Sequence, residues 1–332
     1  MRQSEVLKKF SQLTDSQKEL IGREVDDYLA LNKSLSEEKP TLCPKCGQPH
    51  KMISHGHQKN GKHRYTCSGC GRTMTYDSCT IMSNLKISKD EFIEICRDTL
   101  NLVPIAQTAA KLDLSIPTVH YNRHKFLAVL EDILKAETAL LSGTVEIDET
   151  YELESSKGTP PENRKPRKRG EPSHLRGISH EQVCIVTTTD RNGHELFQAV
   201  GYGKPTSDCV TETFGSRILS KSVIYSDGTF LYDQLSENTG CKLVQLYDYG
   251  CYNIVEHLNT VNAIHKLIKD TMAFYRGVAT KYMNRYMALF VFMRRFMQMD
   301  DNEKMGLLIT YVKNFHCNIT RESLRTSHLF SV

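Results

Sequence analysis

The sequence of 332 residues predicts an α/β protein, in which a mixed sheet flanked by helices follows smaller modules. Strand-type alternation of apolar and polar residues begins near residue 142 and continues, interleaved with helical patterns, to about residue 299. Two C-x-x-C-G units and three helical patterns precede it. We therefore expect a helical segment over residues 1–38, a cysteine-bearing module over 39–80, a three-helix module over 85–132, the α/β domain over 142–299 and a tail over 300–332.

The overall charge is nearly balanced, with 43 Lys plus Arg against 39 Asp plus Glu. A polyanionic partner must therefore be recognised by local clusters of charge. No run approaches the roughly 18 apolar residues of a membrane span, and the first ten residues lack the apolar core of a signal peptide. Composition predicts a cytoplasmic protein with no membrane partner, in which the 11 cysteines serve metal binding rather than disulfides.

Four cysteines form two matched units, C-P-K-C-G and C-S-G-C-G, with twenty residues between them. Two such pairs supply the four thiolates of a tetrahedral zinc site, and the glycine after each pair allows a tight turn around the metal. We expect residues 39–80 to form a zinc ribbon whose ligands are Cys43, Cys46, Cys67 and Cys70.

The same module carries charge of one sign, since residues 43–72 contain six Lys or Arg and no Asp or Glu. A ribbon of this kind is suited to lie against DNA phosphates, although a solvated basic face is the simpler alternative. The residues that we expect to contact DNA here are Lys59, Lys62 and Arg64.

Three helices are predicted over residues 85–132, and the last two are joined by the short turn L-D-L-S. Small side chains such as Ala106, Ala109 and Ala110 allow the close approach of helices that a helix-turn-helix requires. The alternative is a plain three-helix packing unit. The third helix is rich in polar and basic side chains, and we expect DNA contacts from Tyr121, Asn122, Arg123 and Lys125.

The α/β domain is expected to follow the order β-β-β-α-β-α-β-α, which is that of the ribonuclease H-like fold. In that fold, acidic metal ligands lie on the first strand, at the end of the fourth strand and on the helix after the fifth. Asp148, Asp227 and Asn262 fall at those places. The elements are predicted as strands over 144–151, 181–189, 194–200, 222–226 and 242–247, and as helices over 207–219, 230–238 and 257–270.

Oxygen ligands on two adjacent strands are what paired Mg²⁺ ions need. Ions about 3.5 to 4 Å apart can activate an attacking oxygen and stabilise a leaving one during transfer of a phosphodiester. We expect Asp148 and Asp227 to share such ions. Glu149 follows on the same strand and points to the opposite face, so we expect it to support the ligands rather than join them.

Four motifs resemble the DDE-class insertion-sequence transposases, specifically the group with a zinc ribbon and a D-D-N/E-K pattern. They are V-E-I-D-E-T-Y, R-K-P-R-K-R-G followed by R-G-I-S-H-E-Q-V-C, V-I-Y-S-D-G, and H-L-N-T-V-N with a lysine seven residues after its second asparagine. The resemblance covers about residues 40–300. It implies binding to the inverted repeats at transposon ends, metal-dependent DNA cleavage and strand transfer, with two Mg²⁺ ions as cofactors.

The resemblance also assigns roles to residues. Asp148 and Asp227 are the first two acids, Asn262 takes the third position, and Lys269 stands beside it, two helical turns on. Many relatives have Glu at the third position and an aromatic residue three positions later, where this chain has His265. An amide offers an oxygen without charge. The site therefore works with two carboxylates and an amide, or this copy is attenuated.

A proline-rich loop over residues 157–176 is inserted between the first two strands and is strongly basic. Beside a phosphoryl-transfer site, such a loop is suited to clamp DNA, and the alternative is a disordered solvated loop. Its expected DNA contacts are Arg164, Lys165, Arg167, Lys168 and Arg169.

The sequence thus predicts a nucleoid-associated transposase that binds double-stranded DNA, both transposon ends and target, and that forms a homo-oligomer when two ends are paired. Two alternatives remain. One is a DNA-binding regulator without catalysis, because Asn262 departs from the commoner Glu. The other is a Mg²⁺-dependent nuclease that does not join strands.

Overall fold

The computed structural model divides into two compact units. The smaller consists of Met1–Arg97 with Gln298–Asn318, and the larger of Asp98–Met297 with Ile319–Val332. The structure describes residues 8–15, 17–18, 22, 39–59, 61–83, 85–136, 141–157, 168, 170–247, 256–275, 278–300, 303–307 and 319–330. Most of the predicted helical segment over 1–38, and residues 301–302, 308–318 and 331–332 of the tail, lie outside these residues.

A three-stranded antiparallel sheet lies at the centre of the cysteine-bearing module. Its order is β1-β2-β3, with β1 at Met52–His57, β2 at His63–Cys67 and β3 at Thr73–Met74. A short 3₁₀ turn, η1, follows at Tyr76–Cys79. Met52 and Met74 are buried with the cysteines, so the apolar core of this sheet is small.

Three helices occupy the positions expected for the three-helix module. They are α3 at Lys89–Leu100, α4 at Ile105–Leu112 and α5 at Ile116–Ala136. The boundary between the two units falls inside α3. Asp113 ends α4 in the left-handed conformation, with φ 52° and ψ 40°, which Asp tolerates better than most residues.

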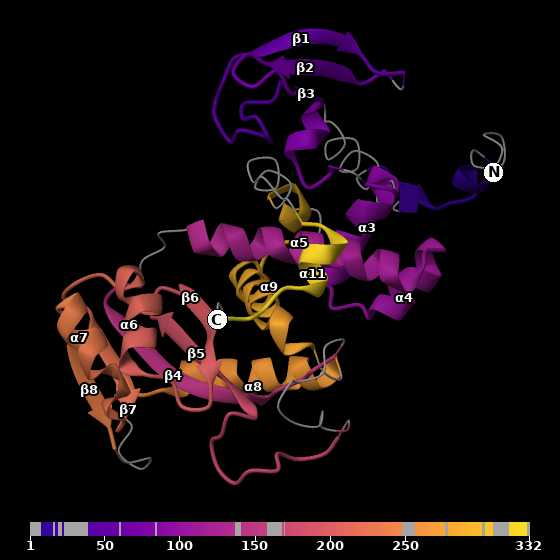
Figure 1. Cartoon of the computed structure of the whole chain (residues 1–332). Coiled ribbons are helices and arrows are strands. Elements are labelled where there is room, and N and C mark those ends of the chain that lie inside the picture. The colour runs from indigo at the N-terminus through magenta and orange to yellow at the C-terminus, as the bar shows by residue number, and fades with distance from the viewer. Residues whose placement is uncertain are drawn as a thin grey trace. The chain divides into compact units, whose positions relative to one another are not determined.

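The larger unit is built on a five-stranded mixed sheet in the order β6-β5-β4-β7-β8 (Figure 1). The first three strands form an antiparallel meander, and β7 and β8 run parallel to β4. This order and these directions resemble the ribonuclease H-like arrangement that the sequence predicts. The strands are β4 at Thr144–Leu153, β5 at Gln182–Asp190, β6 at Glu195–Tyr202, β7 at Val223–Asp227 and β8 at Lys242–Leu246.

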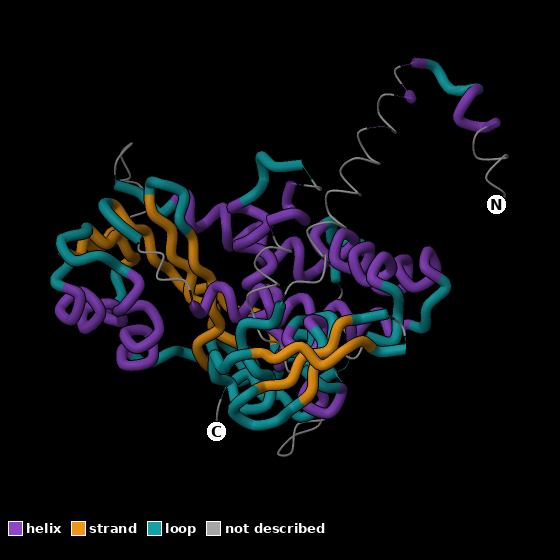
Figure 2. The backbone as a smooth tube through the Cα atoms, turned by 90° about the horizontal axis from the view of Figure 1, so that it is seen from above, coloured by secondary structure: helices purple, strands orange, loops and turns teal. Residues whose placement is uncertain are grey.

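Helices pack on both faces of the sheet (Figure 2). One face carries α6 at Ser207–Phe214 and α7 at Asp233–Thr239, whose side chains share a core with alternate β4 residues such as Val145 and Ile147. The other face carries α8 at Asn259–Phe274 and α9 at Met283–Arg295. The residues of β4 between Val145 and Asp148 therefore point alternately to the α6 and α8 sides.

Short elements complete the larger unit. The 3₁₀ turns are η2 at Gly215–Arg217, η3 at Phe230–Tyr232 and η4 at Thr280–Tyr282, and α11 covers Arg321–Arg325. Helix α5 reaches four residues beyond residue 132, the predicted end of the three-helix module, and packs on α9. No helix among the described residues is both long and apolar enough to cross a membrane.

Candidate active site and cysteine cluster

Three carboxylates gather where β7 ends, beside the central strand β4 of the larger sheet. Asp148 and Glu149 come from β4 and Asp227 from the end of β7, and one oxygen of each lies within 4.8 Å of the others. Asp148 and Asp227 thus lie together, as the motif positions predict. Glu149 points to the opposite face of β4, as strand alternation predicts, and contacts Tyr232 there, yet one of its oxygens still lies near the pair.

The pairing of the strands explains this convergence. Strand β4 pairs with β7 only as far as Glu146, which lies opposite Tyr225. Asp148 and Asp227 each stand two residues further on, where the two strands no longer share a ladder. Because the β4–β7 ladder ends before this point, carboxylates from both faces of β4 can approach Asp227. The end of a ladder depends on how distant strands pair, so the alternation of residues along one strand does not predict it.

The cluster resists ionisation in the absence of cations. Burial, with the charges of Glu149 and Asp227, raises the pKa of Asp148 to about 7. Burial also raises the pKa of Glu149 and that of Asp227. Glu149 is held by the hydroxyl of Tyr232, which donates a hydrogen bond of 2.6 Å to its Oε2. Carboxylates crowded in this way are a suitable ligand set for hard divalent cations.

Helix α8 brings the other predicted site residues to the same face of the sheet. Asn262 and Lys269 are exposed on it, and Lys269 is close enough to lower the pKa of Asp148. His265 is buried, with its Nδ1 3.8 Å from Asp148 Oδ2. Burial first, and then the charge of Lys269, lower the pKa of His265 to about 4. A neutral imidazole thus stands beside the acidic cluster.

Glu146 anchors the start of α8 to the strand that bears Asp148. Its side chain is buried, and its Oε2 accepts hydrogen bonds of 3.0 Å from the backbone amides of Thr260 and Val261 in the first turn. Arg191 lies 2.5 Å from Glu146 Oε1. A carboxylate satisfies amides that have no partner within the helix and interacts favourably with the helix dipole. The motif V-E-I-D contains this residue, but its role depends on the helix about 114 positions later.

Replacing Glu146 with Gln is expected to destabilise the larger unit by about 2 kcal/mol. A neutral amide leaves Arg191 without its buried counter-charge and weakens the contact with the first turn of α8. Urea unfolding followed by circular dichroism measures the effect. Glu237→Gln, an exposed change on α7, is the matched control and is expected to stay within about 0.5 kcal/mol. Equal midpoints for the two variants would show that Glu146 does not secure α8.

The four predicted cysteines converge in the smaller unit, with their sulfur atoms all within 4.8 Å of one another. Each C-x-x-C unit makes the same turn. Gly47 and Gly71 adopt φ values of 65° and 68°, and their amides donate to the carbonyls of Cys43 and Cys67 at 2.8 and 2.9 Å. Only glycine takes this left-handed conformation without strain. Although burial opposes it, backbone amides of Cys46 and Lys45 lower the pKa of Cys43 to about 6.

The basic residues predicted on this module differ in their contacts. Lys59 is exposed. Lys62 forms an ion pair with Asp77, and Arg64 donates to the carbonyl of His55 from Nε and Nη2 at 3.4 and 3.3 Å. The charge of Lys62 is therefore partly neutralised by Asp77 of the same unit.

The residues predicted to read DNA from α5 are largely turned inward. Arg123 is 1% exposed, and its Nη2 donates to the carbonyl of Val103 at 2.7 Å. This corrects the expectation for Arg123, because its guanidinium ties α5 to the segment before α4. Asn122 and Lys125 are also buried, at 3% and 2%, and so are not available to a groove in this conformation. Tyr121 is half-buried, and its hydroxyl donates to Ile319.

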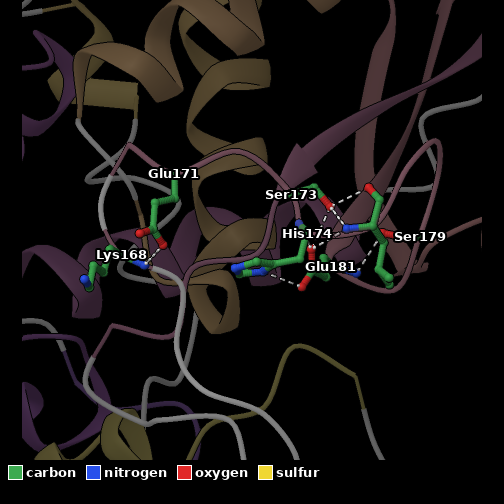
Figure 3. Close-up of polar contacts among 7 residues, drawn as sticks. Lys168, Glu171, Ser173, His174, Ser179 and Glu181 are labelled. Carbon is green, nitrogen blue, oxygen red and sulfur yellow. Dashed lines mark hydrogen bonds and ion pairs between the residues drawn. The ribbon is translucent and has the colours of Figure 1, made fainter.

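The predicted basic loop is described only at a few positions. Arg164, Lys165, Arg167 and Arg169 lie outside the described residues, whereas the amide of Lys168 donates to Glu171 at 2.8 Å. Figure 3 shows the last part of the loop and the residues that follow it, with Glu181 in contact with Ser173 and His174.

Glu181 is the anchor of that segment. Its Oε2 accepts from the hydroxyl of Ser173 at 2.7 Å and from the amide of His174 at 2.6 Å (Figure 3). These hydrogen bonds lower the pKa of Glu181 to about 2. The returning end of the basic loop is thereby fixed at the start of β5, so the R-G-I-S-H-E-Q-V-C motif includes a structural carboxylate.

The mixed sheet, with three acids where its β4 and β7 strands diverge, defines a ribonuclease H-like α/β domain with a candidate divalent-metal site. Residues 140–295 match the model of a protein family, the ISXO2-like transposase domain. This region of the chain is therefore a transposase domain of the DDE insertion-sequence class.

The solved structures similar to this chain include complexes of the Mos1 transposase, at low sequence identity. A pre-cleavage Mos1 transpososome shares 10% identity over 68% of this chain and 76% of that chain, with a TM-score of 0.27. The Mos1 strand transfer complex shares 12% identity over 68% and 75%, with a TM-score of 0.26. No curated protein matches this chain.

Proposed function

We propose that this chain is a DNA transposase that binds the terminal inverted repeats of an insertion sequence, cleaves DNA at their ends and joins them to target DNA. The observation that carries the proposal is the meeting of Asp148, Glu149 and Asp227 where β4 and β7 diverge, inside the transposase domain. Two copies, each bound to one end, are expected to assemble when the ends are paired.

The proposed chemistry assigns a task to each side chain at the cluster. Asp148 and Asp227 would hold two Mg²⁺ ions, and Glu149 would contribute a third carboxylate. Bound there, Mg²⁺ supplies activation of the attacking oxygen and charge stabilisation at the leaving one. Asn262 offers an amide oxygen from the α8 side, and Lys269 holds a DNA phosphate beside the site. His265, neutral and buried, fills the space behind Asp148.

The modules before the transposase domain are proposed to bind DNA. Matched turns and four converging sulfur atoms support zinc in the cysteine cluster. On this module Lys59 is exposed and Arg64 is half-buried, and both contact phosphates. The helix-turn-helix role rests on α4, the short turn at Asp113 and α5. The basic loop, including Lys168, adds phosphate contacts near the acidic cluster.

A joining assay tests the proposal. Purified protein is incubated with Mg²⁺, a labelled duplex carrying the element's terminal repeat and a target plasmid. Joined product is the expected result. Cleavage without joining indicates a nuclease, and binding without cleavage indicates a DNA-binding regulator. Either of these two results would overturn the proposed strand transfer.

Substitutions at Asn262 test the third position of the site. Asn262→Asp is expected to keep measurable joining or to shift the preferred cation from Mg²⁺ to Mn²⁺, because an oxygen ligand remains. Asn262→Leu is expected to lower joining by about 100-fold or more, since leucine offers no ligand. Asn238→Leu, an exposed change on α7, is the matched control. Full joining by Asn262→Leu would assign this side chain to the scaffold alone.

A further inference from the structure

A large open cavity lies in the larger unit, away from the acidic cluster. Its volume is about 1180 Å³, and its walls come from α4, α5, the end of α8, the start of α9 and α11. Helices α5, α9 and α11, which contribute to this lining, lie together in the larger unit (Figure 1). The proposed transposase chemistry does not account for a recess of this size, although Tyr121 and Arg123, two of the DNA contacts predicted from sequence, line it.

The charge of the cavity is of one sign. Among the described residues that line it there is no Asp or Glu. Its five Lys or Arg residues are Arg123, Lys157, Lys281, Arg321 and Arg325. In a chain with nearly equal numbers of acidic and basic residues, such a lining favours an anionic ligand.

Aromatic rings form much of the same lining. The rings of His124 and Tyr282 lie 4.0 Å apart between centroids, and those of Tyr275 and Tyr286 lie 5.2 Å apart. Burial first, and then nearby cations, lower the pKa of His124 well below its usual value. His124, Tyr282 and Tyr286 are buried and support the wall of the cavity, whereas Tyr121 and Tyr275 are only half-buried and can contact a ligand. Phe274, at the rim, is 56% exposed.

Two of the tyrosines are held in place before any ligand arrives. The hydroxyl of Tyr121 donates to the carbonyl of Ile319 at 3.0 Å, and that of Tyr282 donates to the carbonyl of Leu324 at 2.9 Å. The guanidinium of Arg321 lies 5.4 Å from the centre of the Tyr121 ring. Ordered rings beside cations are the combination that binds unpaired bases and their phosphates, at little entropic cost.

Helix α8 connects this cavity with the acidic cluster. Asn262, Lys269 and Ala273 are all exposed on it, and at 3.6 residues per turn they fall within about 40° of one line along the helix. Ala273 lines the cavity. The eleven residues from Asn262 to Ala273 span about 16 Å, which corresponds to about five nucleotides of a stacked strand.

We propose that this cavity binds one or two unstacked nucleotides of the DNA strand that runs from the acidic cluster along α8. The inference rests on the proposed function for the identity of the strand. In a stacked duplex the faces of the bases are covered by neighbouring bases, so they cannot stack on the rings of this cavity. A single-stranded segment presents both phosphates and base faces.

Binding of short probes to the full-length protein tests this inference without any joining reaction. The probes are fluorescein-labelled (dT)8, a duplex of eight base pairs and an octaglutamate peptide, each titrated by anisotropy without added magnesium. Tyr121→Leu is expected to weaken (dT)8 binding about tenfold at every salt concentration, because a stacking ring is lost. Arg321→Ala with Arg325→Ala is expected to weaken it and to reduce the salt slope by about 1.4.

The controls separate this site from general loss of structure or charge. Lys242→Ala removes an exposed charge from β8 and should leave (dT)8 binding within twofold of wild type. Thermal unfolding checks that each variant is folded. If Tyr121→Leu is not, Phe274→Ala replaces it, because Phe274 is an exposed ring of the same lining and its loss is expected to weaken (dT)8 binding in the same way.

Three results would overturn the inference. They are unchanged (dT)8 binding in the cavity variants, an equal loss of duplex binding, and tighter binding of octaglutamate than of (dT)8. Failure of the joining assay with these binding effects intact would instead count against the proposed function alone.

Discussion

Asp148→Asn is expected to abolish DNA joining while making the metal-free protein more stable. An amide is a weaker ligand than a carboxylate, so joining should fall by at least about 10³-fold. Ionising Asp148 is costly in the fold, because its pKa is about 7 against an ordinary value near 3.9. The neutral variant avoids that cost, and its stability at pH 8 should rise by about 1 to 2 kcal/mol.

Two measurements test this pair of effects. Joined product is quantified on a gel, and the unfolding midpoint is measured at pH 8 without divalent cations. Asp270→Asn is the control, because it is an exposed change on α8 that neutralises one acid. It should leave both quantities nearly unchanged. If Asp148→Asn joined DNA at the wild-type rate, Asp148 would not be a ligand of the reaction site.

The pH dependence follows from the same raised pKa. In the fold Asp148 binds its proton more tightly than in the unfolded chain, so its contribution makes the metal-free protein less stable as pH rises from about 4 through 7. Cations favour the ionised form. Added Mg²⁺ should therefore raise the unfolding midpoint more at pH 8 than at pH 5.5, and Asp148→Asn should remove most of that difference.

Cys67→Ser is expected to release the metal of the smaller unit and to unfold β1, β2 and β3. Zinc held by four thiolates contributes on the order of 10 kcal/mol to folding, and the apolar core of this sheet is small, with Met52 and Met74 at its centre. Without the ion, little else opposes the entropy of the chain. The change should act within this unit, because the larger one has its own core.

Metal content and hydrogen exchange measure the outcome. Wild-type protein should carry one zinc per chain, whereas Cys67→Ser should carry less than about one tenth of that at micromolar protein, and the amides of β2 should exchange as fast as in an unfolded peptide. Cys241→Ser, outside the cluster, is the control. A variant at Cys67 that retained one zinc and its exchange protection would exclude Cys67 as a ligand.

Short-range patterns were enough to determine much of this protein. The matched C-x-x-C-G units predicted two similar turns, because the glycine after each pair can adopt the left-handed conformation without a steric penalty. The alternation of residues predicted the strands of the larger sheet and their succession along the chain. Asp148 and Asp227 could be selected as candidates because each occupies a strand position in a fold whose element order is itself a sequence property.

Tertiary structure alone decided what depends on the meeting of distant segments. Glu149 joins the acidic cluster because β4 and β7 diverge beyond Glu146, and Glu146 secures α8 across more than a hundred positions. Arg123 has the charge and the position on α5 expected of a DNA contact, yet it is buried against the segment before α4. Charge and spacing describe what a side chain can do. Burial and partners, which arise only when the chain is packed, decide which of those capacities it uses.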